Sequence, residues 1–231
     1  MVAESMTNFK TEQEEFWAGQ FGRDYISRNQ GDEMLAANLQ FFSSALKRAK
    51  GLDSCIEFGA NIGMNLRALC MLYPKQIQHA IEINPEAAAQ LVKVIPESNV
   101  MNQSIIGFKP SSQWDLVLIK GVLIHVNPDF LPEIYDSLVA SCGRYLLIAE
   151  YYSPEPVGVS YRGHGDRLFK RDFAGEIMDR HPKMTLVDYG FVYHRDLSFP
   201  QDDITWFLLE TKSIRETYDA QILQKLRNAG H

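Results

Sequence analysis

Short apolar runs and amphipathic segments alternate through the middle of the chain. Runs typical of buried strands lie at 54–58, 78–83, 99–103, 114–120 and 144–150. Apolar residues recur at helical spacing in 33–50, 64–73, 85–94 and 130–141. Strands that alternate with helices at this pitch predict a mostly parallel sheet with helices on both faces.

The rhythm changes after residue 150. The polar, glycine-bearing segment 151–167 predicts a long loop, and a helix is expected over Lys170–His181. Two strand-like runs follow at Thr185–His194 and Ile204–Thr211, with only a nine-residue loop between them. Such a loop is too short for a crossover helix, so these strands should pair antiparallel. The expected fold class is α/β, with a seven-stranded, mostly parallel sheet that ends in an antiparallel C-terminal pair.

The chain is expected to form one domain with four parts. Residues 7–50 form an N-terminal helical cap, whose aromatic residues either pack on the body or close over a pocket. Residues 51–150 form the nucleotide-binding half, 151–211 a lid and the antiparallel strands, and 212–231 a polar terminal helix.

Composition and charge narrow the function class. A net charge of −6 over 231 residues argues against a general nucleic-acid binder, which usually carries a basic surface. The three cysteines lack metal or redox spacing, and each is expected to be a small core residue in a reducing cytoplasm. Neither a signal peptide nor a membrane-spanning run is recognisable. We expect no metal, and a homodimer is possible.

The stretch Ser54–Gly63, SCIEFGANIG, leads from a strand through a small-residue turn into a helix. This geometry places backbone N–H groups against a nucleotide-like ligand at the carboxyl edge of a sheet. The spacing is E-x-G-x-N-x-G, whereas a dinucleotide fingerprint needs G-x-G-x-x-G. An ordinary strand–helix turn without a ligand is the alternative. The candidate cofactor contacts of this turn are Glu57, Gly59, Ala60, Asn61 and Gly63.

This turn resembles motif I of class I S-adenosylmethionine (SAM) methyltransferases, usually E/D-x-G-x-G-x-G, with Asn61 in place of the middle glycine. Asparagine tolerates positive φ angles well, so the turn can keep its shape. The resemblance implies a Rossmann-like class I methyltransferase fold with SAM as the cofactor.

Glu82 ends the second strand, 23 residues after Gly59, where the family has an acid that accepts hydrogen bonds from both ribose hydroxyls. The alternative is a surface acid at the start of the next helix. Ile83 would pack on the adenine. Gln103 and Ser104 follow the third strand, where the family reads the adenine amino group, although loops are polar in any case.

The stretch Trp114–Val126, WDLVLIKGVLIHV, resembles motif IV of the same family. Lys120 and Gly121 would lie beside the methionine part of the cofactor, and Asp115 reads as a structural residue at the start of a strand. His125 is either a general base near the methyl group or a residue that orders the loop.

The C-terminal half carries the more specific resemblance. The stretches AEYYSPEPV, YRGHGDRLFKRDFAGE, DYGFVYHRD and DDITWFLLE, together with the N-terminal TEQEEFWAGQFGRDYISRN, resemble the methyltransferase family associated with pseudaminic acid biosynthesis. The resemblance implies methyl transfer to a nonulosonic acid or its precursor in bacterial surface glycans, and therefore a small acidic sugar as the partner.

The residue types in this half suit such a sugar. Arginines suit carboxylate recognition, and tyrosines offer stacking faces and hydroxyl donors. The candidate sugar contacts are Tyr151, Tyr152, Tyr161, Arg162, Arg167 and Arg171, with Lys170 in the same basic cluster. The alternative is a solvated helix start with ordinary ion pairs. The candidate catalytic residues are His125, His164 and His194.

Three other functions fit parts of the pattern. A methyltransferase could act on a protein or a different small molecule. A non-catalytic subunit with the same fold could support a glycan-assembly complex. A nucleotide-sugar oxidoreductase is disfavoured because G-x-G-x-x-G is missing.

Overall fold

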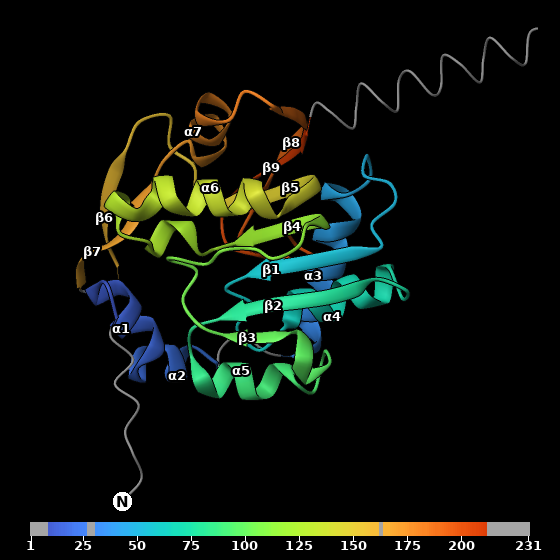
Figure 1. Cartoon of the computed structure of the whole chain (residues 1–231), viewed down its shortest axis with the longest axis horizontal. Helices are drawn as coiled ribbons and strands as arrows, with labels where there is room; N and C mark the ends of the chain where they lie inside the picture. The colour runs from blue at the N-terminus through green and yellow to red at the C-terminus, as the bar shows by residue number, and fades with distance from the viewer. Residues whose placement is uncertain (1–8, 27–30, 162–163, 212–231) are drawn as a thin grey trace, which may run out of the picture.

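The computed structural model describes residues 9–26, 31–161 and 164–211, and the side chains of residues 160–167 lie outside that description. The described chain contains a seven-stranded sheet of order β3-β2-β1-β4-β5-β9-β8 (Figure 1). Its strands are β1 (Ser54–Phe58), β2 (Ile77–Glu82), β3 (Val100–Asn102), β4 (Trp114–Lys120), β5 (Cys142–Glu150), β8 (Met184–Val192) and β9 (Ile204–Thr211).

Strands β1 to β5 pair parallel, and β9 runs antiparallel between β5 and β8. The predicted fold class, including the antiparallel pair, is therefore confirmed. The α-helices are α1 (Glu12–Ala18), α2 (Gln20–Ile26), α3 (Asp32–Ala45), α4 (Met64–Leu72), α5 (Pro85–Leu91), α6 (Leu131–Ser141) and α7 (Phe173–Arg180). Short 3-10 turns are η1 (Glu97–Asn99), η2 (Leu123–His125) and η3 (Pro128–Phe130).

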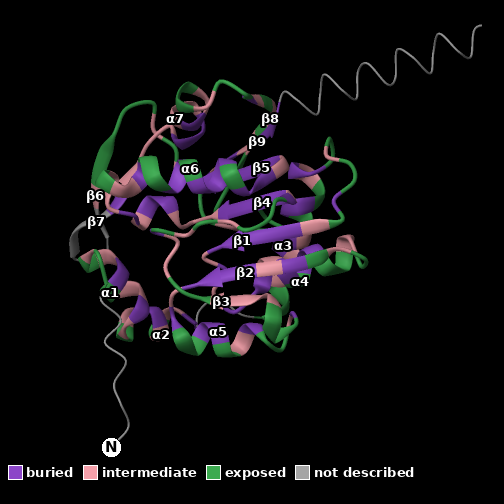
Figure 2. Ribbon diagram, in the orientation of Figure 1, coloured by how far each residue is buried: buried purple, intermediate pink, exposed green. Residues whose placement is uncertain are grey.

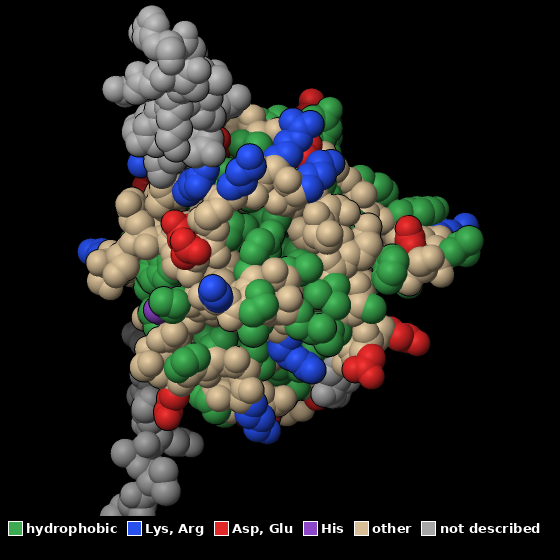
Figure 3. Space-filling view, turned by 90° about the vertical axis from the view of Figure 1, so that its right-hand side faces the viewer, with side chains coloured by type: hydrophobic (Ala, Val, Ile, Leu, Met, Phe, Trp, Pro, Cys, Tyr) green, Lys and Arg blue, Asp and Glu red, His purple; other side chains and the backbone are tan. Residues whose placement is uncertain are grey.

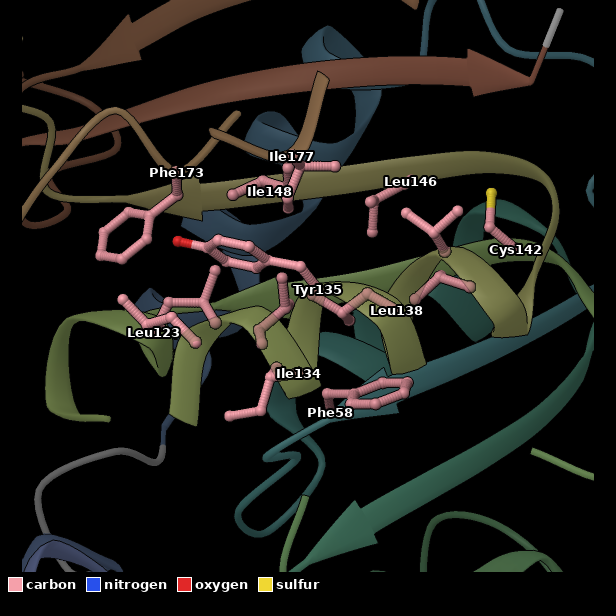
Figure 4. Close-up of a cluster of buried hydrophobic side chains, with 14 of the residues drawn as sticks. Phe58, Leu123, Ile134, Tyr135, Leu138, Cys142, Leu146, Ile148, Phe173 and Ile177 are labelled. Atoms are coloured by element: carbon pink, nitrogen blue, oxygen red, sulfur yellow. The ribbon is translucent and has the colours of Figure 1, made fainter. Parts of the chain in front are cut away.

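Helices cover both faces of the sheet, and each face has its own apolar cluster. One cluster joins α6 and α7 to the sheet and includes Phe58, Tyr135 and Ile177 (Figure 4). The other joins α3, α4 and α5 to the opposite face and includes Phe42 and Leu69. The central strands β1 and β4 are buried along most of their length, as a parallel sheet between two helical layers requires (Figure 2).

Asp115 ties the amino ends of β1 and β4 together. Its Oδ2 accepts hydrogen bonds from the backbone N–H groups of Asp53 and Ser54, at 3.1 and 2.9 Å, and from the Ser54 hydroxyl at 2.8 Å. The Ser54 hydroxyl oxygen in turn accepts the Asp115 N–H at 3.0 Å. The structural interpretation of Asp115 is therefore confirmed.

The segment after β5 differs from the expected loop. Strands β6 (Val157–Tyr161) and β7 (His164–Lys170) pair antiparallel as a separate hairpin. The alternating apolar residues Val157, Val159 and Tyr161 give the first strand its pattern, which the prolines and glycines around it obscured. Helix α7 also begins later than expected, because Asp172 caps it by accepting the Gly175 N–H at 2.9 Å.

The cysteine expectation holds for two of the three residues. Cys55 and Cys142 are buried, whereas Cys70 is exposed because it lies on the outer face of α4. No helix in the described ranges combines the length and the apolar character that crossing a bilayer needs. Within those ranges, no group of three or more His, Cys, Asp or Glu side chains could hold a metal ion.

The face at the amino ends of the parallel strands mixes apolar patches with side chains of both charges (Figure 3). Three basic residues of the described chain form ion pairs with acids of β8 and β9. Lys47 and Arg48 lie 3.4 and 3.3 Å from Asp188, and Arg144 lies 3.7 Å from Glu210. These pairs link the turn after α3 to β8, and β5 to β9.

Replacement of Asp115 by alanine tests the tie between β1 and β4. Asp115→Ala leaves three donors without their acceptor, so we expect the free energy of unfolding to fall by about 1–3 kcal/mol in urea denaturation. The control Asp179→Ala removes an exposed carboxylate of α7 and should change it by less than about 0.5 kcal/mol. Equal stability of the two variants would contradict the structural role of Asp115.

Candidate functional site

A cavity of about 1030 Å³ opens at the carboxyl ends of the parallel strands. Parallel strands place their carboxyl-terminal turns at one edge, which is where ligands bind in α/β sheets. Helices α1 and α2 lie beside this edge and contribute Trp17, Gly22 and Tyr25 to the lining (Figure 1). The aromatic residues of the cap were expected either to pack on the body or to close over a pocket, and Trp17 and Tyr25 lie at a pocket.

The turn after β1 forms one wall of the cavity. Gly59 and Ala60 donate their N–H groups to the Ile81 carbonyl, at 2.8 and 3.1 Å. Asn61 has a φ angle of 48°, the left-handed conformation that its place in the motif suggested. Its N–H donates to Glu82 Oε2 at 2.7 Å. The turn is thereby fixed to the end of β2, and Gly59, Ala60 and Asn61 line the cavity.

The glycines of this turn serve packing as well as shape. A Cβ atom on Gly59, whose φ angle is 76°, would lie 2.6 Å from Val122 Cγ2. A Cβ atom on Gly63, whose φ angle is 82°, would lie 2.8 Å from Leu91 Cδ2. Gly63 is the N-cap of α4 and is not among the residues that line the cavity. Both positions therefore exclude a side chain because of neighbouring protein atoms.

Glu82 is a buried residue at the cavity wall, so the interpretation as a surface acid is wrong. Its Oε2 accepts from Asn61, and its Oε1 accepts the Asn84 N–H at 2.7 Å. Burial raises the pKa of Glu82, and the backbone hydrogen bonds oppose that rise. Ile83, next in the chain, also lines the cavity.

Asn84 extends this arrangement to the N-terminal cap. Its Oδ1 caps α5 by accepting the N–H groups of Glu86 and Ala87, at 3.0 and 3.2 Å. Its Nδ2 donates to the carbonyls of Trp17 and Ala18, at 3.1 and 3.3 Å. One buried side chain therefore holds α1 against the end of β2.

The two residues expected to read adenine are separated. Ser104 lines the cavity, and its hydroxyl donates to Glu14 Oε1, a second contact between the cap and the sheet. Gln103 is exposed and is not among the lining residues. The backbone N–H of Gln103 donates to Glu82 O at 3.1 Å.

Two ionisable side chains, Glu57 and Lys120, lie near the carboxyl ends of β1 and β4. Glu57 is fully buried, its Oε1 accepts from Asn65 Nδ2 at 2.6 Å, and its Oε2 has no hydrogen-bond partner among the described residues. Burial raises the pKa of Glu57 to about 8. Lys120 lines the cavity, and its Nζ lies 3.4 Å from Asn38 Oδ1. Burial lowers the pKa of Lys120, and the nearby Glu57 carboxylate opposes that fall. Glu57 is not among the lining residues, and it affects the cavity through its electrostatic interaction with Lys120.

Glu150 shapes the turn after β4 and was not recognised from the sequence. Its Oε1 accepts the N–H groups of Val122 and Leu123, at 2.9 and 3.0 Å, and its Oε2 accepts that of Ile124 at 3.4 Å. Burial raises the pKa of Glu150 to about 7. The acid at the end of a buried strand is the signal that could have found it, since Glu82 has the same position on β2.

The turn that Glu150 holds presents Gly121 and His125 to the cavity. A Cβ atom on Gly121, whose φ angle is 68°, would meet nothing within 4 Å, so this glycine leaves the cavity open. The His125 ring lies 4.6 Å from the Trp17 ring, centroid to centroid. His125 thus packs against the cap, which suits the expectation that it orders the loop.

The expected sugar contacts fall into three groups. Tyr151 lines the cavity, with Lys170 Nζ 5.4 Å from its ring centroid. Tyr152 is exposed and Arg171 pairs with Glu176 at 2.7 Å; neither is among the lining residues. The pair that Arg171 makes with Glu176 matches the ion-pair alternative. Arg162 lies outside the described residues, as do the side chains of Tyr161, His164 and Arg167.

The loop between β8 and β9 forms the remaining wall, of which the sequence analysis had singled out only His194. The lining residues it contributes are His194, Leu197, Ser198, Pro200, Gln201 and Asp202. His194 Nδ1 lies 2.8 and 2.9 Å from the two oxygens of Asp203, and its backbone N–H donates to Asp203 Oδ1 at 3.0 Å. Met34 and Asn38 of α3 were also missed, because their spacing reads only as a core-facing helix.

The chain matches no protein-family model and no curated protein sequence. Solved structures do resemble it. A SAM-dependent methyltransferase from Leishmania major gives a TM-score of 0.62 at 13% identity, over 86% of each chain. The magnesium protoporphyrin IX methyltransferase of Synechocystis, solved with bound SAM, gives 0.61 at 14% identity, over 89% of this chain and all of the other.

A third structure is the 1,6-didemethyltoxoflavin-N1-methyltransferase of Burkholderia thailandensis, with a TM-score of 0.61 at 18% identity over 83% of this chain and 82% of the other. At these identities the likeness defines the fold. The chain therefore has the Rossmann-like fold of class I methyltransferases, with a cavity at the carboxyl edge of its parallel strands.

The buried Glu57 should make stability depend on pH. The folded protein binds the Glu57 proton more tightly than the unfolded chain does, so its contribution is complete below the ordinary value of 4.5 and is lost as pH rises to about 8. We expect the free energy of unfolding of the ligand-free protein to decrease over that range, and Glu57→Gln to flatten the decrease. The exposed control Glu97→Gln should keep the wild-type profile. A Glu57→Gln profile that parallels wild type would contradict the assignment.

Proposed function

We propose that this protein is a SAM-dependent methyltransferase that acts on a small polar acceptor. The observation that carries the proposal is the cavity itself. In a class I methyltransferase fold, the motif I turn, the Glu82 carboxylate and the post-β4 turn converge on one space. Its volume of about 1030 Å³ lies at the upper end of ligand pockets, which run to about 1,000 Å³, and leaves space for a methyl acceptor beside a cofactor.

The residues at the cavity wall fit SAM. Each Glu82 oxygen accepts one N–H from the protein, and a carboxylate oxygen has a second lone pair for a ribose hydroxyl. Ile83 and Ile105 offer apolar surface for an adenine, with the Ser104 hydroxyl beside them. Lys120 supplies a cation for the methionine carboxylate.

SAM, when bound, supplies an electrophilic methyl group on its sulfonium. The protein has to hold the methyl acceptor in line with that methyl carbon and to exclude water. Trp17, Tyr25 and His125 lie over the cavity from the cap and the post-β4 turn, so they are placed to exclude water. Asn84, through its bonds to the cap carbonyls, keeps that cover in place.

The finer proposal for the acceptor is a nonulosonic acid or its precursor. It is supported by the resemblance of the C-terminal half and by the position of Tyr151 in the cavity wall. Among the described lining residues, the carboxylates of Glu14, Glu33, Glu82 and Asp202 outnumber the Lys120 ammonium. Arg162 and Arg167, the arginines expected to recognise a sugar carboxylate, have side chains outside the described part.

Calorimetry with SAM and with NAD tests the proposed function. We expect SAM to bind and NAD not to bind. Glu82→Gln removes one charged oxygen acceptor and should weaken SAM binding by about 1–3 kcal/mol. Glu86→Gln alters the next acid along the chain, which lies outside the cavity lining, and should leave the affinity unchanged.

Two results would refute parts of this proposal. Tighter binding of NAD than of SAM would favour an oxidoreductase. SAM binding without methyl transfer to any sugar, peptide or small-molecule acceptor would favour a non-catalytic subunit with this fold.

A further inference from the structure

The β8–β9 loop, residues 193–203, carries polar residues on the cavity wall that no cofactor motif uses: His194, Ser198, Gln201 and Asp202. His194 and Gln201 come from its two ends, and Asp202 follows Gln201. The loop has a fixed shape, because Asp196 Oδ1 accepts the N–H groups of Ser198 and Phe199 at 2.9 and 2.8 Å. The same cavity contains the SAM candidates, so a molecule bound against this loop would lie beside the cofactor.

Asp203 orients the His194 ring. Both Asp203 oxygens lie within 2.9 Å of Nδ1, and a carboxylate can only accept, so Nδ1 carries a proton toward Asp203. In the neutral imidazole this leaves Nε2 as the acceptor of a proton. A carboxylate that fixes the tautomer of a histidine in this way is a recurring arrangement for a general base.

Gln201 supplies a second signal. Its Oε1 and its Nε2 are buried, and neither atom has a hydrogen-bond partner among the described residues. A buried amide without partners costs about 1–3 kcal/mol per group, so a polar ligand group at this place would be favoured. The amide offers one acceptor and two donors, which matches a hydroxyl or an amide on a ligand.

We propose that the loop 193–203 is the methyl-acceptor subsite and that it selects a hydroxyl group, with His194 as the base, Asp203 as its positioning residue and the Gln201 amide bound to a neighbouring polar group. This inference rests on the proposed function. It names the methyl acceptor as a hydroxylated small molecule and the product as a methyl ether.

The step balances within the named groups. The acceptor O–H bond breaks, and its proton passes to His194 Nε2. The oxygen lone pair forms the new O–CH₃ bond while the bond between sulfur and the methyl carbon breaks, and the electron pair of that bond stays on sulfur. The imidazolium then loses its proton to water. Methyl ether and S-adenosylhomocysteine are the products.

The first measurement is the tautomer of His194, read by ¹⁵N NMR of the full chain with S-adenosylhomocysteine bound. Wild type should carry its ring proton on Nδ1, and Asp203→Ala should move it toward Nε2. The control Asp179→Ala removes an exposed carboxylate of α7, outside this loop, and should keep the wild-type tautomer. The same tautomer in Asp203→Ala and wild type would overturn the role of Asp203.

The second measurement is binding of defined probes to the same complex. N-acetylneuraminic acid, N-acetylglucosamine and myo-inositol are hydroxylated, whereas cadaverine and histamine carry amines without hydroxyls. At millimolar concentration at least one hydroxylated probe should shift the Gln201 amide and His194 ring signals. Shifts by the amines alone, or by none of the probes, would overturn the hydroxyl subsite.

The third measurement is turnover of the hydroxylated probe that shifts these signals most. It distinguishes the role of His194 from that of Gln201. His194→Gln should lower kcat by about 10²–10⁴ with little change in KM, since it removes a base. Gln201→Ala should mainly raise KM, and the surface control Gln40→Ala should match wild type. Full activity of His194→Gln, or no methylation of the probe by wild type, would overturn the base.

Calorimetry with SAM on every variant distinguishes failure of the proposed function from failure of the acceptor subsite. We expect each variant to bind SAM with an affinity within about twofold of wild type, which is a change of less than roughly 0.4 kcal/mol in binding free energy. Loss of SAM binding by wild type itself refutes the proposed function, whereas intact SAM binding with unshifted probe signals refutes only this subsite.

Discussion

The carboxylate of Glu82 is the contact on which the arrangement of the site depends. One oxygen accepts an N–H from the turn after β1, and the other accepts an N–H from Asn84, which starts α5. Asn84 in turn holds the carbonyls at the end of α1. A short chain of hydrogen bonds therefore links two strands, a helix and the cap. Without the buried carboxylate, the turn after β1 would no longer be connected to the start of α5 and to the cap.

Local signals predicted the sheet well, because apolar runs of strand length between amphipathic helices leave few alternatives. The resemblance to the class I motifs singled out Glu82 and Lys120, and both residues line the cavity. Gly59 also lines the cavity, but no local pattern encodes its packing against Val122, a residue distant in sequence that a Cβ atom would meet. Arg171 pairs with Glu176, five residues along the chain, which matches the ion-pair alternative for that residue.

The β8–β9 loop shows why part of the site was invisible. Its residues 195–203 read as an ordinary polar connection, and only the antiparallel return of β9 beside β5 brings that connection to the cavity. Glu150 was missed for a related reason, since its partners are the backbone N–H groups of a turn that starts 28 residues earlier. Tertiary contacts of this kind are set by topology, and topology follows from all the strands together.

Glu82 and Glu150 end strands β2 and β5, Glu57 is the residue before the last of β1, and burial raises the pKa of all three acids. Lys120 is the one ammonium near Glu57 and Glu150 that lines the cavity in the described chain, and burial weakens its own charged form. A cationic ligand at this edge would supply the missing positive charge and favour the ionised carboxylates. By linkage, the cavity should then bind a cation such as a sulfonium more tightly as these acids ionise. Glu82 lines the cavity, and Glu150 holds the turn after β4 that also lines it. A positively charged cofactor in the cavity would offset part of the cost of burying these carboxylates.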